Sequence, residues 1–169
     1  MVKLGCYFPY SLITFDVPRN MITWCCKQET GNLLSSFNPK EYFSDPVLTD
    51  IRSSLNNGIE HTLCSSCWKT EKSGIQSWRQ TNGSIPDHLK NINLDTMPYN
   101  KIVKRLEIKL DNTCDLACIY CGPWDSTTWQ RENNKSKFHN YTIDVIDDSL
   151  QQKIIDTVLE IGKSNNELE

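Results

Sequence analysis

LEIKLDNTCDLACIYC, residues 106–121, holds the strongest pattern in this sequence. Its first part alternates apolar and charged residues, which predicts a β-strand with one apolar face over residues 106–110. Its second part places Cys114, Cys118 and Cys121 in a C-x3-C-x2-C loop. The sequence therefore predicts a strand that leads directly into a cysteine loop.

The spacing of this loop favours an iron–sulfur cluster over a zinc ion. Three thiolates this close together can hold three irons of a cubane cluster. Because such clusters are ordinarily held by four cysteines, three ligands leave one iron open to an outside molecule. A structural zinc site would need a fourth ligand nearby. The nearest histidine, His139, lies downstream in a polar stretch and shows no paired finger spacing.

A helix is expected after the loop. Apolar residues recur at helical spacing over residues 150–161, which predicts an amphipathic helix of about three turns. Asp147-Asp148-Ser149 supplies a cap and acidic side chains that suit a helix N-terminus. Residues 126–140 are polar and carry no such pattern. Strand, loop and helix together predict one βα unit.

The N-terminal segment predicts a hairpin followed by two helices. Residues 12–15 and 21–24 are β-like, and the Pro- and Asn-containing stretch between them favours a hairpin turn. Ser44-Asp45-Pro46 predicts a capped helix start, and Gly58 its end. A short polar helix is expected to end near Gly74. Such a small core usually needs a metal or a disulfide to stabilise it.

These patterns divide the chain into three parts. Residues 1–80 are expected to form a small, metal-stapled hairpin-plus-helix domain. Residues 81–101 are polar, contain an Asn-Gly pair and two prolines, and indicate a linker. Residues 102–169 are expected to hold the βα unit. The predicted fold class is therefore α+β for the first domain and α/β for the second.

Composition and charge exclude several classes of protein. The chain has 169 residues and a formal net charge of −3, and this mild acidity disfavours a protein that coats nucleic-acid duplexes. No apolar run approaches the ~20 residues that span a bilayer. Prolines and an aspartate interrupt the N-terminal segment where a signal peptide would need an apolar core. We therefore expect no nucleic-acid partner, no membrane partner and a cytoplasmic location.

Cysteine is the residue type that stands out. There are eight, in two groups: Cys6, Cys25, Cys26, Cys64 and Cys67, then Cys114, Cys118 and Cys121. In a reducing compartment, clustered thiols more often bind metal than form disulfides. The grouping predicts two metal-binding segments.

Residues 106–123 resemble the first strand and cluster loop of the radical S-adenosylmethionine (SAM) enzymes. The resemblance rests on the cysteine spacing, on the strand before it, and on the aromatic Tyr120 directly before the last cysteine. It implies that Cys114, Cys118 and Cys121 hold a [4Fe-4S] cluster, that SAM binds the open iron, and that Tyr120 lies close to the adenine. An electron donor would then drive SAM cleavage to a radical that removes hydrogen from a substrate. The difficult chemistry would belong to the cofactor.

The N-terminal segment is similar to the SPASM/twitch auxiliary-cluster domains attached to radical SAM enzymes. By that resemblance Cys64, Cys67, Cys6 and one of Cys25 and Cys26 hold a second iron–sulfur cluster. Neighbouring residues of an extended chain point to opposite faces, so only one of the vicinal pair is expected to bind. The same residues could instead form a four-cysteine zinc knuckle. A thioredoxin-like redox motif at residues 64–67 is disfavoured, because no buried strand is predicted before it.

The resemblance stops before a full barrel is reached. A (β/α)8 barrel takes about 250 residues, or about 31 for each βα unit. Residues 102–169 therefore suffice for one unit with a long loop, and the family's Gly-Gly-Glu-type motif of the second strand is missing. We expect the start of a barrel that further sequence or a second chain completes, acting on a substrate such as a peptide. The alternative is a non-catalytic module, either an iron–sulfur electron carrier or a zinc-stapled interaction domain.

Overall fold

The computed structural model describes residues 5–28, 31–135 and 147–166. Its strands are β1 (Leu12–Asp16), β2 (Met21–Thr23), β3 (Asn32–Leu33) and β4 (Arg105–Lys109). Its α-helices are α1 (Phe8–Ser11), α2 (Pro39–Phe43), α3 (Pro46–Asn56), α4 (Ser65–Lys72), α5 (Trp78–Asn82), α6 (Tyr99–Ile102), α7 (Thr127–Lys135) and α8 (Asp148–Asn166). Short 3-10 helices are η1 (Val17–Arg19), η2 (Leu34–Ser36), η3 (Thr62–Cys64), η4 (Asp87–Leu89) and η5 (Leu94–Thr96).

The four strands form one sheet in the order β3-β2-β1-β4. Strands β1 and β2 are antiparallel, with Phe15 opposite Ile22, which confirms the predicted hairpin. The turn is η1, where the Asp16 side chain accepts a hydrogen bond from the Arg19 N–H and Asn20 adopts a left-handed φ of 49°. Asparagine tolerates this conformation better than most residues, because its short polar side chain can hydrogen-bond locally.

The sheet joins the two parts that the sequence pattern separates. Strand β4 pairs in parallel with β1, and Ile108 lies opposite Phe15. The hairpin of the expected first domain and the strand of the expected second domain therefore share one sheet. Within the described residues they form a common core rather than two independent ones.

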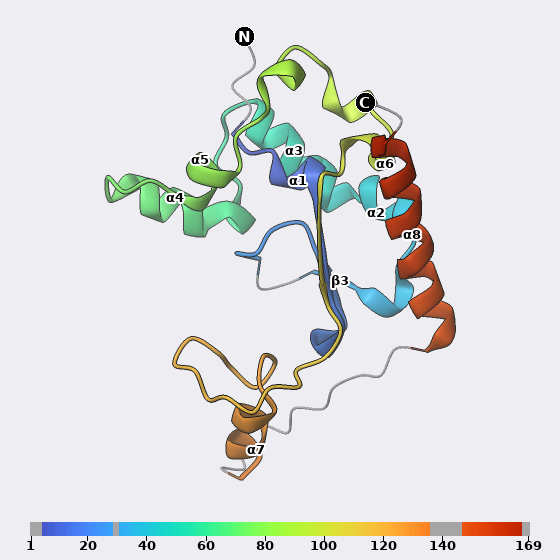
Figure 1. The fold of residues 1–169 in the computed structure, drawn as a ribbon. Helices are drawn as coiled ribbons and strands as arrows, with labels where there is room; N and C mark the ends of the chain where they lie inside the picture. Colours follow the sequence, from blue (N-terminus) through green and yellow to red (C-terminus); the bar gives the residue numbers. More distant parts are fainter. Residues whose placement is uncertain (1–4, 29–30, 136–146, 167–169) are drawn as a thin grey trace.

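The two faces of the sheet differ in polarity. Ile13 and Phe15 are fully buried, and the Phe15 ring contacts the Phe37 ring edge to face at 5.2 Å. Figure 1 shows α2 and α8 on one side of the sheet and α4 and α5 on the other. On the opposite face, the Thr14 hydroxyl donates to Glu107 of the neighbouring strand at 3.1 Å. The second face is thus mixed, because Leu12, on the same face of β1 as Thr14, is buried in the core.

The predicted strand 106–110 is present as β4, but its apolar face is only partly covered. Ile108 is 45% exposed and Leu110 is 61% exposed. The reason is position: β4 is the last strand of the sheet, and no strand among the described residues pairs with its outer edge. The alternation of apolar and charged residues predicts the strand correctly, but it does not predict that the strand lies at the edge of the sheet.

Two of the predicted helices have the predicted ends. In α3 the Asp45 side chain accepts hydrogen bonds from the N–H groups of Val47 and Leu48, and the chain leaves the helix toward Gly58 at a φ of 70°. Helix α4 ends before Gly74, whose φ is 80°. Both glycines supply the left-handed conformation that commonly stops a helix.

The segment expected to be a linker contains short helices and buried residues. Residues 81–101 contain η4 and η5 and the start of α6, and Leu89 and Leu94 are buried in the common core. Helix α8 packs against α6, and Glu160 accepts hydrogen bonds from the side chains of Tyr99 and Asn100. The linker therefore belongs to the folded core and contacts the last helix through α6.

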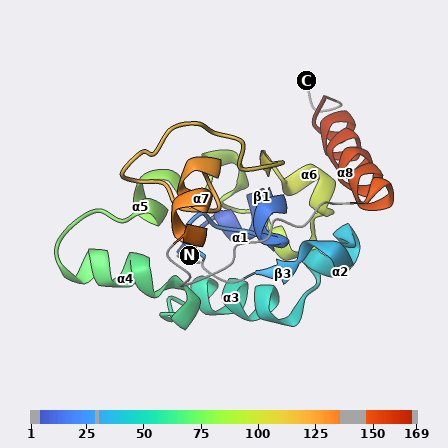
Figure 2. The same cartoon turned by 90° about the horizontal axis from the view of Figure 1, so that it is seen from below.

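The two C-terminal helices differ in how well the sequence predicts them. Helix α8 spans Asp148–Asn166, longer than expected, and the Asp147 side chain caps it by accepting from the Leu150 N–H at 2.7 Å. Helix α7 occupies part of the stretch expected to be irregular. Figure 2 shows α4 and α8 at opposite sides of the molecule. Among the described residues, no helix has the length and apolar character of a membrane span.

Candidate metal sites

The three-cysteine loop extends from the carboxyl end of β4. Cys118 is exposed, Cys114 and Cys121 are partly exposed, and all three are free thiols. The Cys121 N–H donates to the Cys118 carbonyl at 3.0 Å, so a tight turn brings the last two cysteines together. Tyr120, in this turn, is 96% exposed. The loop presents its thiols and its aromatic side chain on the surface.

Helix α7 holds the loop through side chains at its N-terminal end. Ser126 and Thr127 hydroxyls donate to the Cys114 carbonyl at 3.3 and 2.7 Å, and the Trp129 indole N–H donates to the Cys118 carbonyl at 2.9 Å. Ser126 is fully buried. These hydrogen bonds fix the main chain at the first two cysteines, and none of them involves a thiol.

The base of the loop is closed by a second set of contacts. The Asn112 side chain donates to the Pro123 carbonyl at 2.8 Å, which joins the two ends of the loop. Asp125 accepts from the Gly122 N–H at 3.3 Å and forms an ion pair with Lys109 on β4. Burial opposes ionisation, yet the Lys109 ammonium and the Gly122 N–H hold the pKa of Asp125 below its usual range. Asp125 thus anchors the loop to the sheet.

The pKa of one thiol in the loop responds to burial and to its neighbours. Desolvation, together with Cys118, Asp125 and Cys114, raises the pKa of the Cys121 thiol. The Cys114 and Cys118 thiols therefore influence the Cys121 thiol electrostatically. A bound cation would reverse this balance, because cysteines bind metal as thiolates.

A second group of cysteines lines one small cavity of about 20 Å³. The four are Cys6, Cys25, Cys64 and Cys67. They come from different parts of the fold: the segment before α1, the segment after β2, and the junction of η3 with α4. A cavity of this size holds about one water molecule. The fold thus brings together thiols from three separate segments of the chain.

Burial favours the protonated form of the Cys6 and Cys64 thiols. Desolvation raises the pKa of Cys6 to about 12 and that of Cys64 to about 11. The Arg79 guanidinium acts in the opposite direction on both thiols. Arg79 itself stacks over the Trp68 ring at 4.0 Å and pairs with Glu71. Arg79 is a positive group beside this site that the sequence pattern does not single out.

The vicinal cysteines take different environments. Cys25 is buried and lines the cavity, whereas Cys26 is exposed and lines a separate cleft. The Cys25 thiol hydrogen-bonds to Cys26, and this contact lowers the pKa of Cys26 to about 7, with Lys27 acting in the same direction. Only one of the pair therefore faces the other three cysteines.

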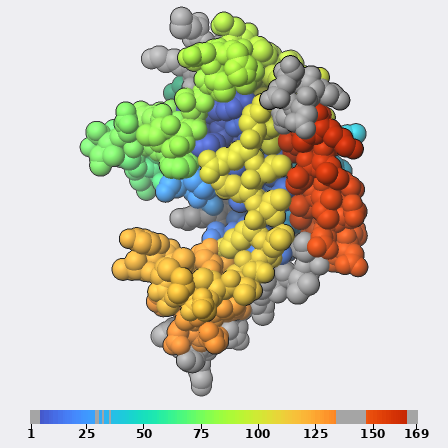
Figure 3. Space-filling model, in the orientation of Figure 1, coloured from blue at the N-terminus to red at the C-terminus, as the bar shows by residue number. Residues whose placement is uncertain are grey.

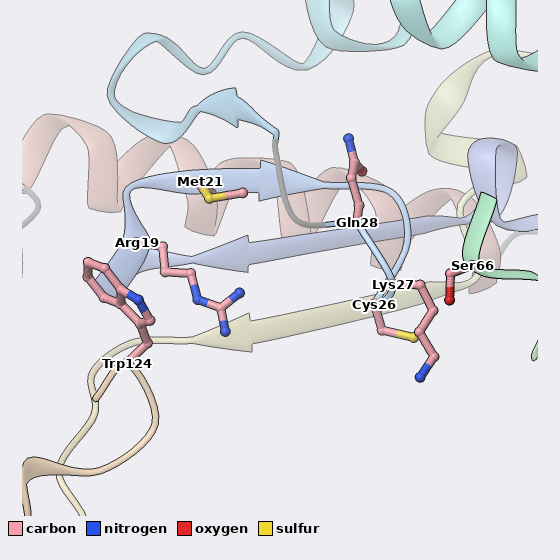
Figure 4. Close-up of a pocket in the computed structure, with 7 residues that line it drawn as sticks. All are labelled: Arg19, Met21, Cys26, Lys27, Gln28, Ser66 and Trp124. Atoms are coloured by element: carbon pink, nitrogen blue, oxygen red, sulfur yellow. The ribbon is translucent and has the colours of Figure 1, made fainter. Parts of the chain in front are cut away.

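The cleft that Cys26 lines has a volume of about 520 Å³. Figure 3 shows the surface hollowed between the part formed by α4 and α5 and the part formed by the cysteine loop and α7. Figure 4 shows Arg19 and Trp124 at one end, on the side of the three-cysteine loop, and Cys26, Lys27 and Ser66 at the other. Ser66 lies between Cys64 and Cys67 in the sequence. The cleft is therefore lined at one end by a residue that follows the three-cysteine loop and at the other by a residue that lies between two cysteines of the cavity.

Within the described part of the chain, which includes all eight cysteines, no three His, Cys, Asp or Glu side chains are close enough to hold a metal ion. Metal binding at either site would require the sulfurs to move toward a common centre. No family model matches this chain, and no curated protein or solved structure matches it.

Proposed function

We propose that this chain is an iron–sulfur protein of the radical SAM type, with an open-site cluster at Cys114, Cys118 and Cys121. The proposal is carried by one arrangement: three free thiols on an exposed loop whose main-chain carbonyls are already bonded to α7. Three thiols without a fourth ligand suit a cubane cluster that keeps one iron for another molecule. When bound, the cluster would supply the electron that cleaves SAM and starts radical modification of a substrate.

The residues around the loop have defined tasks in this proposal. The three thiols bind iron, and α7 orients them through the Cys114 and Cys118 carbonyls. Tyr120 is exposed beside the last cysteine and is free to contact the adenine of SAM. An external electron donor would reach the cluster from the exposed side of the loop.

The four-cysteine cavity is proposed as the second, auxiliary site. Cys25, and not Cys26, is the fourth ligand in this proposal, because it lines the cavity with Cys6, Cys64 and Cys67. A substrate in the 520 Å³ cleft would lie between the two sites, and this volume is within the range of small-molecule pockets. A peptide side chain is one such substrate.

The outer edge of β4 is where a barrel would continue. No strand among the described residues pairs there, and Ile108 and Leu110 expose apolar surface beside it. We propose that further strands, from the same protein or from a second chain, add to this edge. The free thiols suit a reducing compartment, and we place the protein in the cytoplasm.

A non-catalytic zinc module is the second candidate, and one observation favours it. The cavity between the four cysteines is about 20 Å³, which suits a single ion better than a cubane cluster. A four-cysteine zinc site would stabilise the fold without any reaction. In that case the three-cysteine loop would serve another purpose.

Anaerobic reconstitution of the full chain with iron and sulfide distinguishes the candidates. Two cubane clusters give about eight irons per chain, falling to about four when Cys114, Cys118 and Cys121 are all changed to alanine. SAM should alter the EPR spectrum of the reduced cluster that this triple variant loses. Stoichiometric zinc with no cluster absorbance would overturn the iron–sulfur proposal, and an EPR spectrum unaffected by SAM would overturn the SAM site.

A further inference from the structure

A cavity of about 260 Å³ lies among α1, α2, α3, η5 and α6, and no cysteine lines it. Its wall is aromatic: the Phe43 and Tyr99 rings stack with centroids 5.2 Å apart and planes inclined by 13°. Tyr10 and Leu94 also line it, together with the guanidinium of Arg52. It is separate from the cleft and from both cysteine groups.

Arg52 is the unusual residue of this cavity, because its side chain is buried while two of its N–H groups have no hydrogen-bond acceptor among the described residues. The residue is 7% exposed. Its Nε and Nη2 donate to the Pro9 carbonyl at 3.0 and 2.8 Å, and Nη1 donates to the Phe43 carbonyl at 2.8 Å. A guanidinium has five N–H groups. Among the described residues, no acceptor meets the remaining two, one on each terminal nitrogen.

The charge of Arg52 also lacks a direct counter-ion within the described part of the chain, where no carboxylate lies within 4 Å of the guanidinium. The faces of Tyr10 and Phe43 lie 4.7 and 5.7 Å from it instead. Aromatic rings and carbonyl oxygens offset only part of the cost of burying a charge. An anion in the cavity would meet both the charge and the unused N–H groups.

The other charged groups at the cavity leave a positive balance. Lys40 is exposed at its edge and forms no ion pair with any described residue. Asp95 also lines the cavity and lies near Tyr10 and Arg52, so it opposes an anion. Two cations and one carboxylate give a net charge of +1 for a ligand to neutralise.

From these contacts we infer that the cavity binds a small carboxylate with a flat apolar body. The carboxylate accepts the two unused N–H groups of Arg52, which are suited to a bidentate pair, and the body packs on the Phe43–Tyr99 wall. The bonds from Arg52 to Pro9 and Phe43 tie α1 and α2 to α3, but that structural role leaves the two remaining N–H groups unused. This inference is independent of the proposed metal sites.

The test uses 4-fluorobenzoate as the probe and the full chain as the receptor, with binding measured by 19F NMR line broadening. The uncharged isostere 4-fluorobenzamide is the matched ligand control. We expect saturable benzoate binding, weakened about tenfold for the amide and for Arg52→Lys, which keeps the charge but loses the planar fork. Inorganic phosphate should compete only weakly, because it lacks the apolar body.

A second variant keeps the test decisive if Arg52→Lys does not fold. Lys40→Gln alters an exposed side chain and should weaken benzoate binding severalfold, whereas Lys69→Gln on α4, with the same charge change, should not. Absence of saturable binding, equal binding of acid and amide, or equal effects of the two lysine variants would each overturn the inference.

Discussion

Thr127 and Cys114 exchange hydrogen bonds in both directions. The Thr127 hydroxyl donates to the Cys114 carbonyl at 2.7 Å, and the Cys114 N–H donates to the same hydroxyl oxygen at 3.4 Å. The first residue of α7 is thereby attached to the first cysteine of the loop. A helix made largely of polar residues thus has a clear structural task, which is to hold the loop in place.

Thr127→Val tests this attachment. Valine keeps the shape of threonine but removes the hydroxyl, so it should cost about 1 kcal/mol of unfolding free energy. The looser loop should release iron to a chelator severalfold faster after reconstitution, and the Cys114 N–H should exchange faster with solvent. Thr127→Ser is the control, because it retains the hydroxyl. Equal iron release and equal amide exchange in the valine variant and the wild type would contradict the role of α7.

The vicinal cysteines should respond very differently to substitution. Cys25→Ser removes a buried thiol of the four-cysteine cavity and should abolish metal binding there. Cys26→Ser removes an exposed thiol of the cleft and should leave the metal content unchanged. The measurement is the metal content per chain after reconstitution. Both variants are made in the chain in which Cys114, Cys118 and Cys121 are already changed to alanine. Loss of metal in the Cys26 variant alone would reverse the assignment.

Local signals predicted the local elements well. The hairpin, the Asp45 cap of α3 and the Asp147 cap of α8 follow from residues next to each other in the sequence. In each case the physical cause operates within a few residues, so the sequence contains it. Cys25 and Cys26 do differ in burial, but they lie at a turn, where the Gln28 N–H donates to the Cys25 carbonyl at 3.0 Å, and not in an extended strand.

The pairing of distant strands is not encoded in local sequence patterns. Thr14 and Glu107 lie side by side in the sheet, yet neither periodicity nor turn residues report which distant strands meet. The predicted linker at residues 81–101 shows no sign of core packing for a related reason, because the buried Leu89 and Leu94 are single apolar residues in polar surroundings. Helix α7 has no apolar stripe, and its one sequence signal is the Ser- and Thr-rich start.

Gly83 provides a test of how closely the chain packs around the four-cysteine cavity. A Cβ atom there would lie 2.7 Å from the Arg79 carbonyl oxygen and 2.8 Å from the Cys6 sulfur. Gly83→Ala should therefore lower the unfolding free energy by about 1–3 kcal/mol and displace Cys6. Urea unfolding measures the first effect, and metal content after reconstitution measures the second.

Gly162→Ala is the matched control for that substitution. Gly162 lies inside α8, and a Cβ atom there meets nothing within 4 Å. Alanine should stabilise the helix by about 0.5–1 kcal/mol, because it lowers the entropy lost on folding. If both alanine variants moved the urea midpoint in the same direction, the close approach at Gly83 would not be the cause.

Tyr10 should make stability depend on pH in alkaline solution. Burial raises the pKa of its hydroxyl to about 12, above the value near 10 of an exposed tyrosine. Between these values the folded chain binds more protons than the unfolded chain. The contribution of Tyr10 is therefore complete below pH ~10 and declines as the pH rises, with a limiting slope of about 1.4 kcal/mol per pH unit.

Tyr10→Phe isolates this contribution from that of the other buried tyrosines. At pH 8 the variant should be less stable by about 1 kcal/mol, because the Asn56 side chain loses the hydroxyl oxygen to which it donates at 3.1 Å. As the pH rises from 10 toward 11.5, the wild type should lose stability faster, so the two urea midpoints should converge. Parallel midpoints across this range would show that Tyr10 ionises in the folded chain as easily as in the unfolded one.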